Sequence, residues 1–167
     1  MTTPARRTGH TKSGTFTSAR QATEITNSKE QGILDTNTVI LLSQISDPSV
    51  LPGESMITAV TLAELSAGPL VAADESEQAR RQAILQQAEA DFDPLPFNDA
   101  AARTFGRVAA NLRAAGRKPA ARAYDALIAA TAIANGLPLY TTNPDDFAAI
   151  DELELVAVPH PNQSVKN

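Results

Sequence analysis

The sequence predicts one three-layer α/β/α domain, in which helices cover both faces of a mainly parallel central sheet. Short apolar segments that suit strands alternate with longer segments that suit helices, and this alternation is typical of parallel sheets. The length of 167 residues is that of a single domain with a sizeable core. Apolar residues make up 43% of the chain and aromatic residues only 4%, which favours helices packed through small side chains.

Four segments are predicted to be the strands of this sheet. The first is an apolar run that begins at Gly32 and ends in the carboxylate of Asp35. The segment Leu95-Pro96-Phe97 is too short and too constrained by its proline to be a central strand. The predicted strands are residues 32–35, 55–58, 137–142 and 153–158.

Five segments are predicted to be helices, and their ends carry capping or helix-stopping residues. Gly68-Pro69 stops the second, Asn98 or Asp99 caps the fourth, and Gly116 and Gly136 end the last two. The third segment is amphipathic, and the fifth is rich in alanine and suited to burial against the sheet. The predicted helices are residues 39–45, 59–67, 73–90, 99–115 and 123–135.

Charge is distributed unevenly along the chain. Residues 1–31 hold eleven Ser/Thr, five Lys/Arg and two Glu, and we predict that they form a disordered basic tail. The predicted domain spans residues 32–160, with a C-terminal tail over 161–167. Because the whole chain has a net charge of −5, the domain itself is strongly acidic. Charge alone therefore argues against nucleic-acid binding, although clustered carboxylates suit a hard cation.

Several classes of protein are excluded by composition. The chain has no cysteine, so neither disulfides nor a thiolate metal site can form. No apolar run approaches the ~18 residues of a membrane span. Arg6-Arg7 is not followed by the apolar segment of an export signal. We therefore expect a cytoplasmic protein with no membrane partner.

Asp35 is the first candidate for a functional residue. It lies at the carboxyl end of the first predicted strand, and open α/β sheets place their ligands in the crevice at those ends. The alternative is that Asp35 only caps a helix that begins near Thr38.

Two more acidic residues and one amide occupy comparable positions. Glu64 lies inside an otherwise apolar helix, where a charge is costly unless it is paired or ligating; the alternative is a solvated helix face. Asp125 falls in the first turn of the alanine-rich helix, where the helix dipole favours an anion. Asn143 follows the third strand. These positions converge on one edge of a parallel sheet.

Such a set of oxygen donors suits Mg²⁺, or Mn²⁺ in its place, and argues against zinc. The two histidines, His10 and His160, lie near opposite ends of the chain, so a histidine-based catalytic pair is not expected. Mg²⁺ keeps several waters and can activate one for attack at phosphorus. The residues alone therefore predict metal-assisted phosphoester chemistry.

A basic window lies between the third and fifth predicted helices. It contains two pairs of arginines spaced four residues apart, which are neighbours on a helix. Like charges placed in this way indicate an anionic partner, and contacts of this kind position an RNA backbone without reading its sequence. The alternative is a solvated helix face followed by a basic loop. The candidates for RNA-backbone contacts are Arg103, Arg107, Arg113 and Arg117.

Four stretches, in this order, resemble the PIN-domain ribonucleases, and among them the VapC toxins of bacterial type II toxin–antitoxin pairs. The Asp-Ala-Leu-Ile-Ala-Ala run and the Thr-x-Asn-x-x-Asp-Phe run make the resemblance specific, and it spans about residues 32–160. The stretches are residues 34–37, 61–68, 124–132 and 141–147. The resemblance implies a PIN-like fold and a Mg²⁺-dependent endoribonuclease that acts on structured RNA such as tRNA or rRNA. It also implies a homodimer that is silenced by a cognate antitoxin, often through a basic side chain placed at the acidic site.

The resemblance also implies roles for individual residues. Asp35, Glu64 and Asp125 match the acidic triad, and the fourth acidic position of the family falls on Asn143. Asp146 then becomes the expected fourth carboxylate, with its neighbour Asp145 as the alternative or with both as a helix cap. Asp35 and Asp125 are expected to hold the ion, with Glu64 and Asp146 contributing directly or through water. The expected site-shaping residues are Thr36, Asn37, Thr142 and Asn143.

Two competing functions deserve comparison. Residues 35–39 also resemble the opening motif of haloacid-dehalogenase phosphatases, but Asn37 replaces the acid that this motif needs, and an amide is not a general acid at neutral pH. The second alternative is a PIN-like scaffold that binds RNA or protein without cutting it, which only the amide at Asn143 favours.

Overall fold

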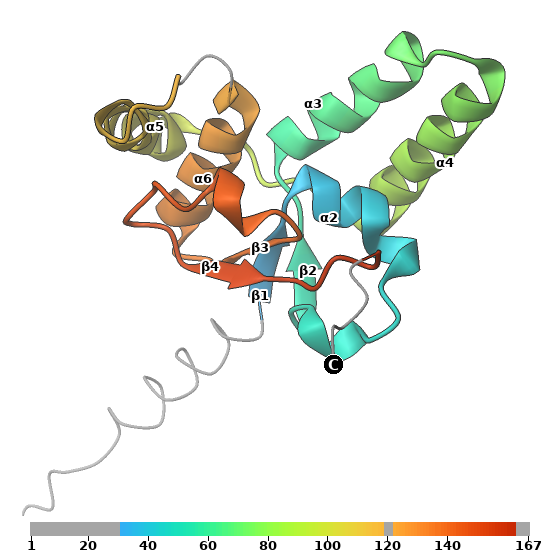
Figure 1. Ribbon diagram of the computed structural model, residues 1–167, viewed down its shortest axis with the longest axis horizontal. Coiled ribbons are helices and arrows are strands. Elements are labelled where there is room, and N and C mark those ends of the chain that lie inside the picture. The colour runs from blue at the N-terminus through green and yellow to red at the C-terminus, as the bar shows by residue number, and fades with distance from the viewer. Residues whose placement is uncertain (1–30, 119–121, 163–167) are drawn as a thin grey trace, which may run out of the picture.

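The computed structural model describes residues 31–118 and 122–162, and in them a parallel sheet of four strands lies at the centre (Figure 1). The strand order is β2-β1-β3-β4, and every neighbouring pair is parallel. The strands are β1 (Gln31–Leu34), β2 (Glu54–Met56), β3 (Leu139–Thr141) and β4 (Leu155–Ala157). The predicted N-terminal tail, apart from residue 31, and most of the predicted C-terminal tail lie outside the described residues.

Five α-helices and several 3₁₀ turns connect these strands in the described residues. The helices are α2 (Thr36–Leu41), α3 (Ala59–Ala67), α4 (Glu75–Asp91), α5 (Asp99–Ala114) and α6 (Ala123–Asn135). The 3₁₀ turns are η1 (Leu42–Gln44), η2 (Pro48–Val50), η3 (Gly68–Val71) and η5 (Pro144–Asp146).

The predicted helix boundaries are confirmed where the sequence carries a strong cap. The hydroxyl of Thr58 accepts a hydrogen bond from the backbone N–H of Thr61 and begins α3 at the predicted residue. Gly136 ends α6 in the left-handed conformation, with φ of 63°, which glycine adopts without strain. The side chain of Asn98, not of Asp99, caps α5.

Two predicted helix starts are wrong, because more than one nearby polar residue could cap the helix. The first helix begins at Thr36, three residues before the predicted start, because the side chain of Asp35 already caps it. It is also shorter, since the chain tightens into η1 after Leu41. Asp74 caps α4, so this helix begins at Glu75 and not at Ala73. The third and fourth strands are three residues long each, shorter than predicted.

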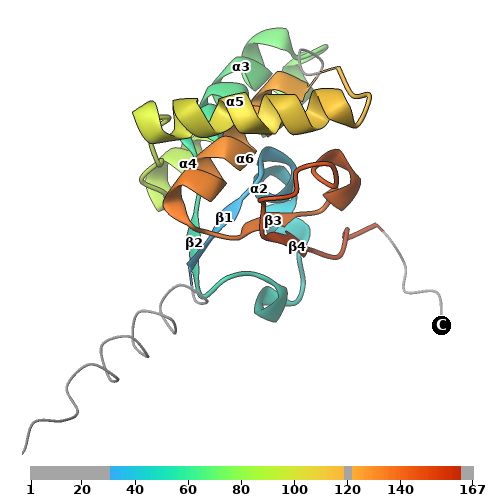
Figure 2. The ribbon, with the colours of Figure 1, turned by 90° about the vertical axis from the view of Figure 1, so that its left-hand side faces the viewer.

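The core lies in two clusters, one on each face of the sheet, and this confirms the three layers. Successive residues of a strand point to opposite faces, and both Ile33 and Leu34 of β1 are fully buried. Ile33 packs in the cluster formed with α5 and α6, whereas Leu34 packs in the cluster formed with α2 and α4. Figures 1 and 2 show α5 lying along α6 on one side of the strands, and α4 lies on the other side in Figure 1.

The ring of Tyr140 on β3 lies close to Gly32 on the neighbouring strand β1. A Cβ atom at Gly32 would lie 2.4 Å from the Cε2 atom of Tyr140, so the ring of Tyr140 occupies the space that a side chain on β1 would need. Tyr140 is half-buried and packs against the cluster on the α2 and α4 side. None of the helices in the described residues is long and apolar enough to cross a membrane.

Candidate active site

Asp35 lies at the carboxyl end of β1, and both predicted roles of its side chain are compatible with the geometry. Its Oδ1 accepts a 2.8 Å hydrogen bond from the backbone N–H of Thr38, which caps α2. Its Oδ2 accepts a 2.7 Å hydrogen bond from the hydroxyl of Thr141 at the end of β3. Only 3% of the residue is exposed, and this burial raises the pKa of the Asp35 carboxyl above its usual value.

A network of threonines holds the ends of β1 and β3 together. The Thr38 hydroxyl accepts a 3.1 Å hydrogen bond from the backbone N–H of Thr142 and lies 3.3 Å from the carbonyl oxygen of Tyr140, to which it donates. The Thr141 hydroxyl, besides donating to Asp35, accepts a 2.9 Å hydrogen bond from the backbone N–H of Asn143. The Thr38 and Thr141 hydroxyls therefore each serve as donor and acceptor, and the Asp35 carboxylate is fixed from α2 and from β3.

Glu64 is not a residue of a solvated helix face. It is half-buried, and its carboxylate accepts a hydrogen bond from the hydroxyl of Thr36 in the first turn of α2. Burial raises the pKa of Glu64, and the nearby charge of Asp35 raises it further. Thr36 therefore orients a carboxylate of the site, as a site-shaping residue would.

Asp125, in the first turn of α6, has the most perturbed pKa of the three. Burial, followed by the charges of Asp146 and Glu64, raises the pKa of Asp125 to about 6. The helix dipole alone would favour the anion and act in the opposite direction. The pKa of Asp125 is therefore raised first by burial and then by the carboxylates of Asp146 and Glu64.

Asp146, in η5, is a further carboxylate whose charge acts on the acidic triad. Its charge contributes to the raised pKa of both Asp35 and Asp125, whereas Asp145 contributes to neither. The Asp146 carboxylate forms an ion pair with the guanidinium of Arg122. The structure therefore places Asp146, in preference to Asp145, next to the triad.

Arg122 is a residue that the sequence analysis did not assign to the site. Besides Asp146, its Nη1 lies 3.7 Å from the Oδ2 atom of Asp125. The position three residues before Asp125, at the start of the same helix, was the available signal, because residues so spaced are neighbours on a helix.

Thr142 and Asn143 line a different hollow. A cavity of about 620 Å³ between η5 and the end of β4 is lined by both of them, and also by Asp145, Asp146 and His160. The Thr142 hydroxyl is buried and has no hydrogen-bond partner among the described residues. Asp146 is therefore the residue that connects this hollow to the acidic triad.

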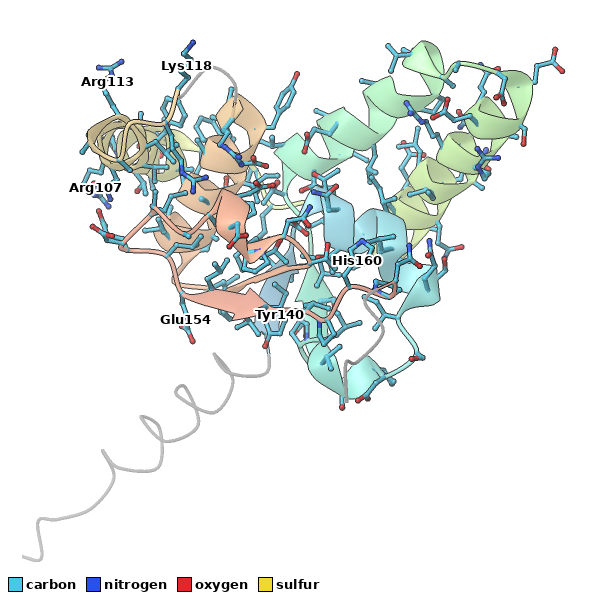
Figure 3. All side chains as sticks on the ribbon, in the orientation of Figure 1. Arg107, Arg113, Lys118, Tyr140, Glu154 and His160 are labelled. Atoms are coloured by element: carbon cyan, nitrogen blue, oxygen red, sulfur yellow. The ribbon has the colours of Figure 1, made fainter. Side chains whose placement is uncertain are left out.

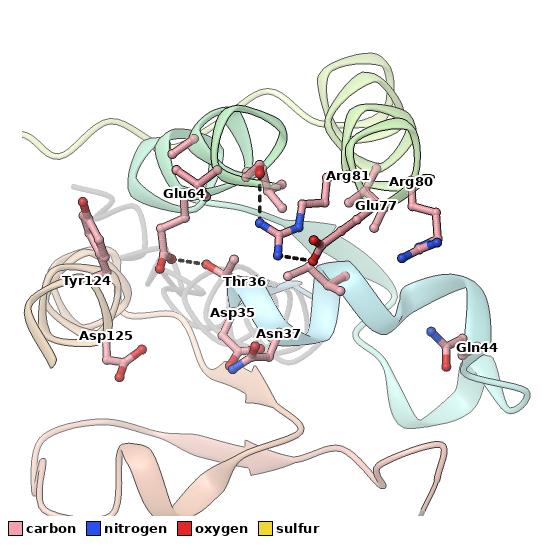
Figure 4. Close-up of a pocket in the computed structure, with 16 residues that line it drawn as sticks. Asp35, Thr36, Asn37, Gln44, Glu64, Glu77, Arg80, Arg81, Tyr124 and Asp125 are labelled. Atoms are coloured by element: carbon pink, nitrogen blue, oxygen red, sulfur yellow. Dashed lines mark hydrogen bonds and ion pairs between the residues drawn. The ribbon is translucent and has the colours of Figure 1, made fainter. Parts of the chain in front are cut away.

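The triad itself opens into a larger cavity of about 680 Å³ (Figure 4). Asp35, Glu64 and Asp125 line it, together with the predicted site-shaping residues Thr36 and Asn37. The opposite wall comes from α4 and was not predicted. It presents Glu77, Arg80, Arg81 and Ile84.

The arginines of the basic window do not line this cavity. Arg103 pairs with Asp99 at 2.9 Å and Arg107 pairs with Glu152 at 2.9 Å, both on the surface. Arg107 and Arg113 project from the outer side of α5 (Figure 3). Arg103 and Arg107 therefore lie on a surface separate from the acidic cavity, whereas Arg122, at the end of the window, contacts Asp125 and Asp146. The role of Arg103, Arg107, Arg113 and Arg117 in RNA contacts stays a prediction.

The carboxylates are not arranged as a finished metal site. In residues 31–118 and 122–162, no group of three or more Asp, Glu or His side chains is placed so that it could hold a metal ion as it stands. Two of these carboxylates have other partners: Glu64 accepts from the Thr36 hydroxyl, and Asp146 pairs with Arg122.

Comparison of the sequence with known proteins points to one family. The PIN domain family model matches residues 33–153. Ribonuclease VapC5 of Mycobacterium tuberculosis is 40% identical over 122 residues, which cover 72% of this chain and 87% of that protein. Ribonuclease VapC4 of the same organism is 34% identical over 113 residues, covering 67% and 84%.

A solved structure shows the same likeness in three dimensions. The crystal structure of VapBC-5, a member of the VapBC family of toxin–antitoxin systems from Mycobacterium tuberculosis, matches with a TM-score of 0.68 and 39% identity, covering 77% of this chain and 99% of that chain. The match rules out the haloacid-dehalogenase alternative. With its parallel sheet, its acidic cavity and these relatives, the chain belongs to the PIN domain family, and within that family it is of the VapC type.

Proposed function

We propose that this protein is a Mg²⁺-dependent endoribonuclease, the toxin of a toxin–antitoxin pair, and that it cleaves structured cellular RNA such as tRNA or rRNA. The observation that carries the proposal is the meeting of Asp35, Glu64 and Asp125 in one cavity at the carboxyl edge of the sheet. The relatives named as ribonucleases support it.

The donor chemistry of the cavity fits Mg²⁺ or Mn²⁺. The donors are carboxylate oxygens, which hard cations prefer. Burial first, and then the charge of a neighbouring carboxylate, raises the pKa of Asp35, of Glu64 and of Asp125. A bound cation would neutralise these neighbouring charges. Asp35 and Asp125 would hold the ion, with Glu64 and Asp146 completing its surroundings. When bound, the ion would supply an acidified water and neutralise charge on the scissile phosphate.

The chain's own residues prepare this reaction. Thr38 and Thr141 fix the Asp35 carboxylate, so that it does not have to be ordered when substrate arrives. Thr36 positions Glu64. Arg122 neutralises Asp146 and Asp125 while no cation does so, and its guanidinium is also a donor suited to a phosphate.

A cognate antitoxin and a second copy of the chain are the protein partners in this proposal. The similar solved structures are named as VapBC systems, which supports an antitoxin partner. An acidic cavity of this kind suits neutralisation by a basic side chain of the antitoxin. The homodimer follows from the family resemblance alone.

The proposal is tested by incubating purified full-length protein, freed of any antitoxin by denaturation and refolding, with total cellular RNA and Mg²⁺ or Mn²⁺. We expect discrete fragments that disappear with EDTA, and mapping their ends identifies the target. If the refolded protein binds Mn²⁺ by calorimetry and cuts no RNA with either metal, the nuclease is refuted and the scaffold alternative takes its place.

Metal binding should weaken in acid. Protons compete with a cation for carboxylates, and the pKa of Asp125 is raised to about 6. A group with this pKa is mostly ionised at pH 7.5 and about one-tenth ionised at pH 5, so the Kd for Mn²⁺ should rise about tenfold over that interval. Calorimetric titration at several pH values measures it. An affinity that is constant from pH 7.5 to pH 5 contradicts the assignment of Asp125 as a ligand.

Replacing Arg122 by alanine should lower the stability of the metal-free protein and raise the affinity of the protein for Mn²⁺. Without Mn²⁺, the loss of its ion pairs with Asp146 and Asp125 should lower stability by about 1 kcal/mol. With Mn²⁺, the affinity should rise several-fold, because a competing positive charge has been removed. Thermal melting with and without Mn²⁺ measures both effects. Arg113→Ala, an exposed arginine of α5, is the matched control, and weaker Mn²⁺ binding by Arg122→Ala would overturn the interpretation.

A further inference from the structure

The cavity that holds the acidic triad has an aromatic side chain on its rim. Tyr124, next to Asp125 at the start of α6, lines the cavity and is 57% exposed. It is one of the few large hydrophobic side chains that the described part of the chain leaves in solvent. The side chain of Tyr124 therefore contributes little to the core and is available to a ligand.

The other end of the cavity carries Arg80, whose side chain is also available to a ligand. Arg81 is committed to the fold, since it donates to the carbonyl oxygen of Gly68 at 2.9 Å and pairs with Glu77. Arg80 donates only to the hydroxyl of Ser76, at 2.8 Å, and has no acidic partner among the described residues. Its charge is therefore free to meet an anion that enters the cavity.

The acidic triad lies between these two features. Figure 4 shows Tyr124 beside Glu64 and Asp125 at one end, and Arg80 beyond Asp35 at the opposite end. All of these residues line the same cavity of about 680 Å³. A polyanion that crosses the triad would therefore meet a flat aromatic face on one side of the triad and a positive charge on the other.

We infer that this cavity binds an unpaired RNA strand across the triad, with one base stacked on Tyr124 and a phosphate on the far side of the cut held by Arg80. An aromatic ring can stack only on a base that has left the duplex, whereas bases inside an A-form helix are covered by their neighbours. The site therefore selects single-stranded segments, such as loops, within structured RNA. This inference rests on the ribonuclease function proposed above and adds to it two residues, Tyr124 and Arg80, that position the strand on either side of the triad.

The composition of the chain provides a direct readout of the stacking. The protein has no Trp and two Tyr, and the second, Tyr140, is half-buried against Gly32. A base stacked on Tyr124 should quench tyrosine emission, and Tyr124→Phe should abolish the quenching and keep the binding. Ca²⁺ replaces Mg²⁺ in this measurement to neutralise the carboxylates, and electrophoresis verifies that the RNA stays intact.

Binding to a labelled single strand of about ten nucleotides of mixed sequence, and to the same strand annealed to its complement, tests the affinity. The single strand should bind more tightly than the duplex. Tyr124→Ala should raise the Kd for the single strand about tenfold. Arg80→Ala should lower the slope of log Kd against log salt by about 0.7, as expected for one lost phosphate contact on a single strand. Leu70→Ala removes another exposed apolar side chain, 83% exposed and outside the cavity lining, and should leave the affinity unchanged.

Three results would overturn the inference: equal affinity for duplex and single strand, wild-type binding by Tyr124→Ala, or quenching that persists in Tyr124→Phe. It would also be overturned if Tyr124→Ala and Arg80→Ala cut RNA normally but escaped the antitoxin, since the two ends of the cavity would then be a protein-binding surface. Tyr124-dependent binding of single strands without cleavage in any metal would support the binding site and refute the nuclease. The two proposals therefore fail separately.

Discussion

Replacing Asp35 by asparagine should lower RNA cleavage by more than about 1,000-fold, as expected when a residue that holds the catalytic metal loses its charge. The carboxylate is buried and is held in place by Thr38 and Thr141. Cleavage of total RNA in Mg²⁺, followed over time for both proteins, measures the effect.

Asparagine is the informative substitution because Asp35 also caps α2. Asparagine caps helices about as well as aspartate does, so the Asp35→Asn protein should keep its fold and melt within a few degrees of wild type. Asp35→Ala removes the cap as well, which costs about 1 kcal/mol, and leaves the N–H of Thr38 without its partner. Comparing the two variants separates the cap from the metal ligand. Wild-type cleavage by a folded Asp35→Asn protein would refute the assignment of the site.

Replacing Asp125 by asparagine should abolish cleavage to a similar extent and make the metal-free protein more stable. The pKa of this carboxyl is raised from 3.8 to about 6. For such a group the stability contribution is fully present below pH 3.8 and is lost as the pH rises through about 6. At neutral pH the ionised Asp125 therefore destabilises the fold, and the neutral amide removes this cost.

The expected gain for Asp125→Asn is about 1 to 2 kcal/mol at pH 7.5, which corresponds to a rise in Tm of about 3 to 8 °C. It is smaller than the full pKa shift implies, because 31% of the side chain is exposed and solvent screens the charge. Melting curves at pH 7.5 and pH 4 measure it, and the gain should shrink at the lower pH. Mn²⁺ should stabilise the wild type more than the variant. A variant that is less stable than wild type at pH 7.5 would contradict the electrostatic account.

The alternation of segments was sufficient to predict the fold. The two central strands, β1 and β3, carry fully buried apolar residues, so the segments around Ile33 and Leu139 stand out as short apolar runs. Thr58 and Gly136 mark helix ends with side-chain and backbone chemistry that depends on few other residues. The errors arose where one residue has two possible roles, as with Asp35, whose cap moved the start of α2 to Thr36.

The acidic triad was predictable because the carboxyl ends of parallel strands meet at one edge of the sheet. Glu64 was identifiable as a charge that an apolar helix would otherwise exclude. Asp146 could not be separated from Asp145 in the sequence, since adjacent residues of a 3₁₀ turn point in different directions that only the tertiary structure defines.

Arg122 could have been assigned from its position three residues before Asp125, whereas Arg80 could not be assigned from its own segment. Arg80 reaches the cavity because α4 packs against α2 and the end of α3, and nothing in its own segment indicates that neighbour. The basic window was conspicuous in the sequence, yet Arg103 and Arg107 are paired with surface acids. Clustering of charge along the chain therefore did not distinguish Arg122, which pairs with Asp125 and Asp146, from the arginines that face away from the site.

The hydrogen bond between Thr141 and Asp35 joins residues 106 positions apart in the chain. During synthesis, Asp35 leaves the ribosome long before the strand that fixes it. A growing chain that has not yet reached β3 lacks both the hydroxyl of Thr141 and the strand that covers β1 on that side. The Asp35 site is therefore completed only after most of the chain has been translated.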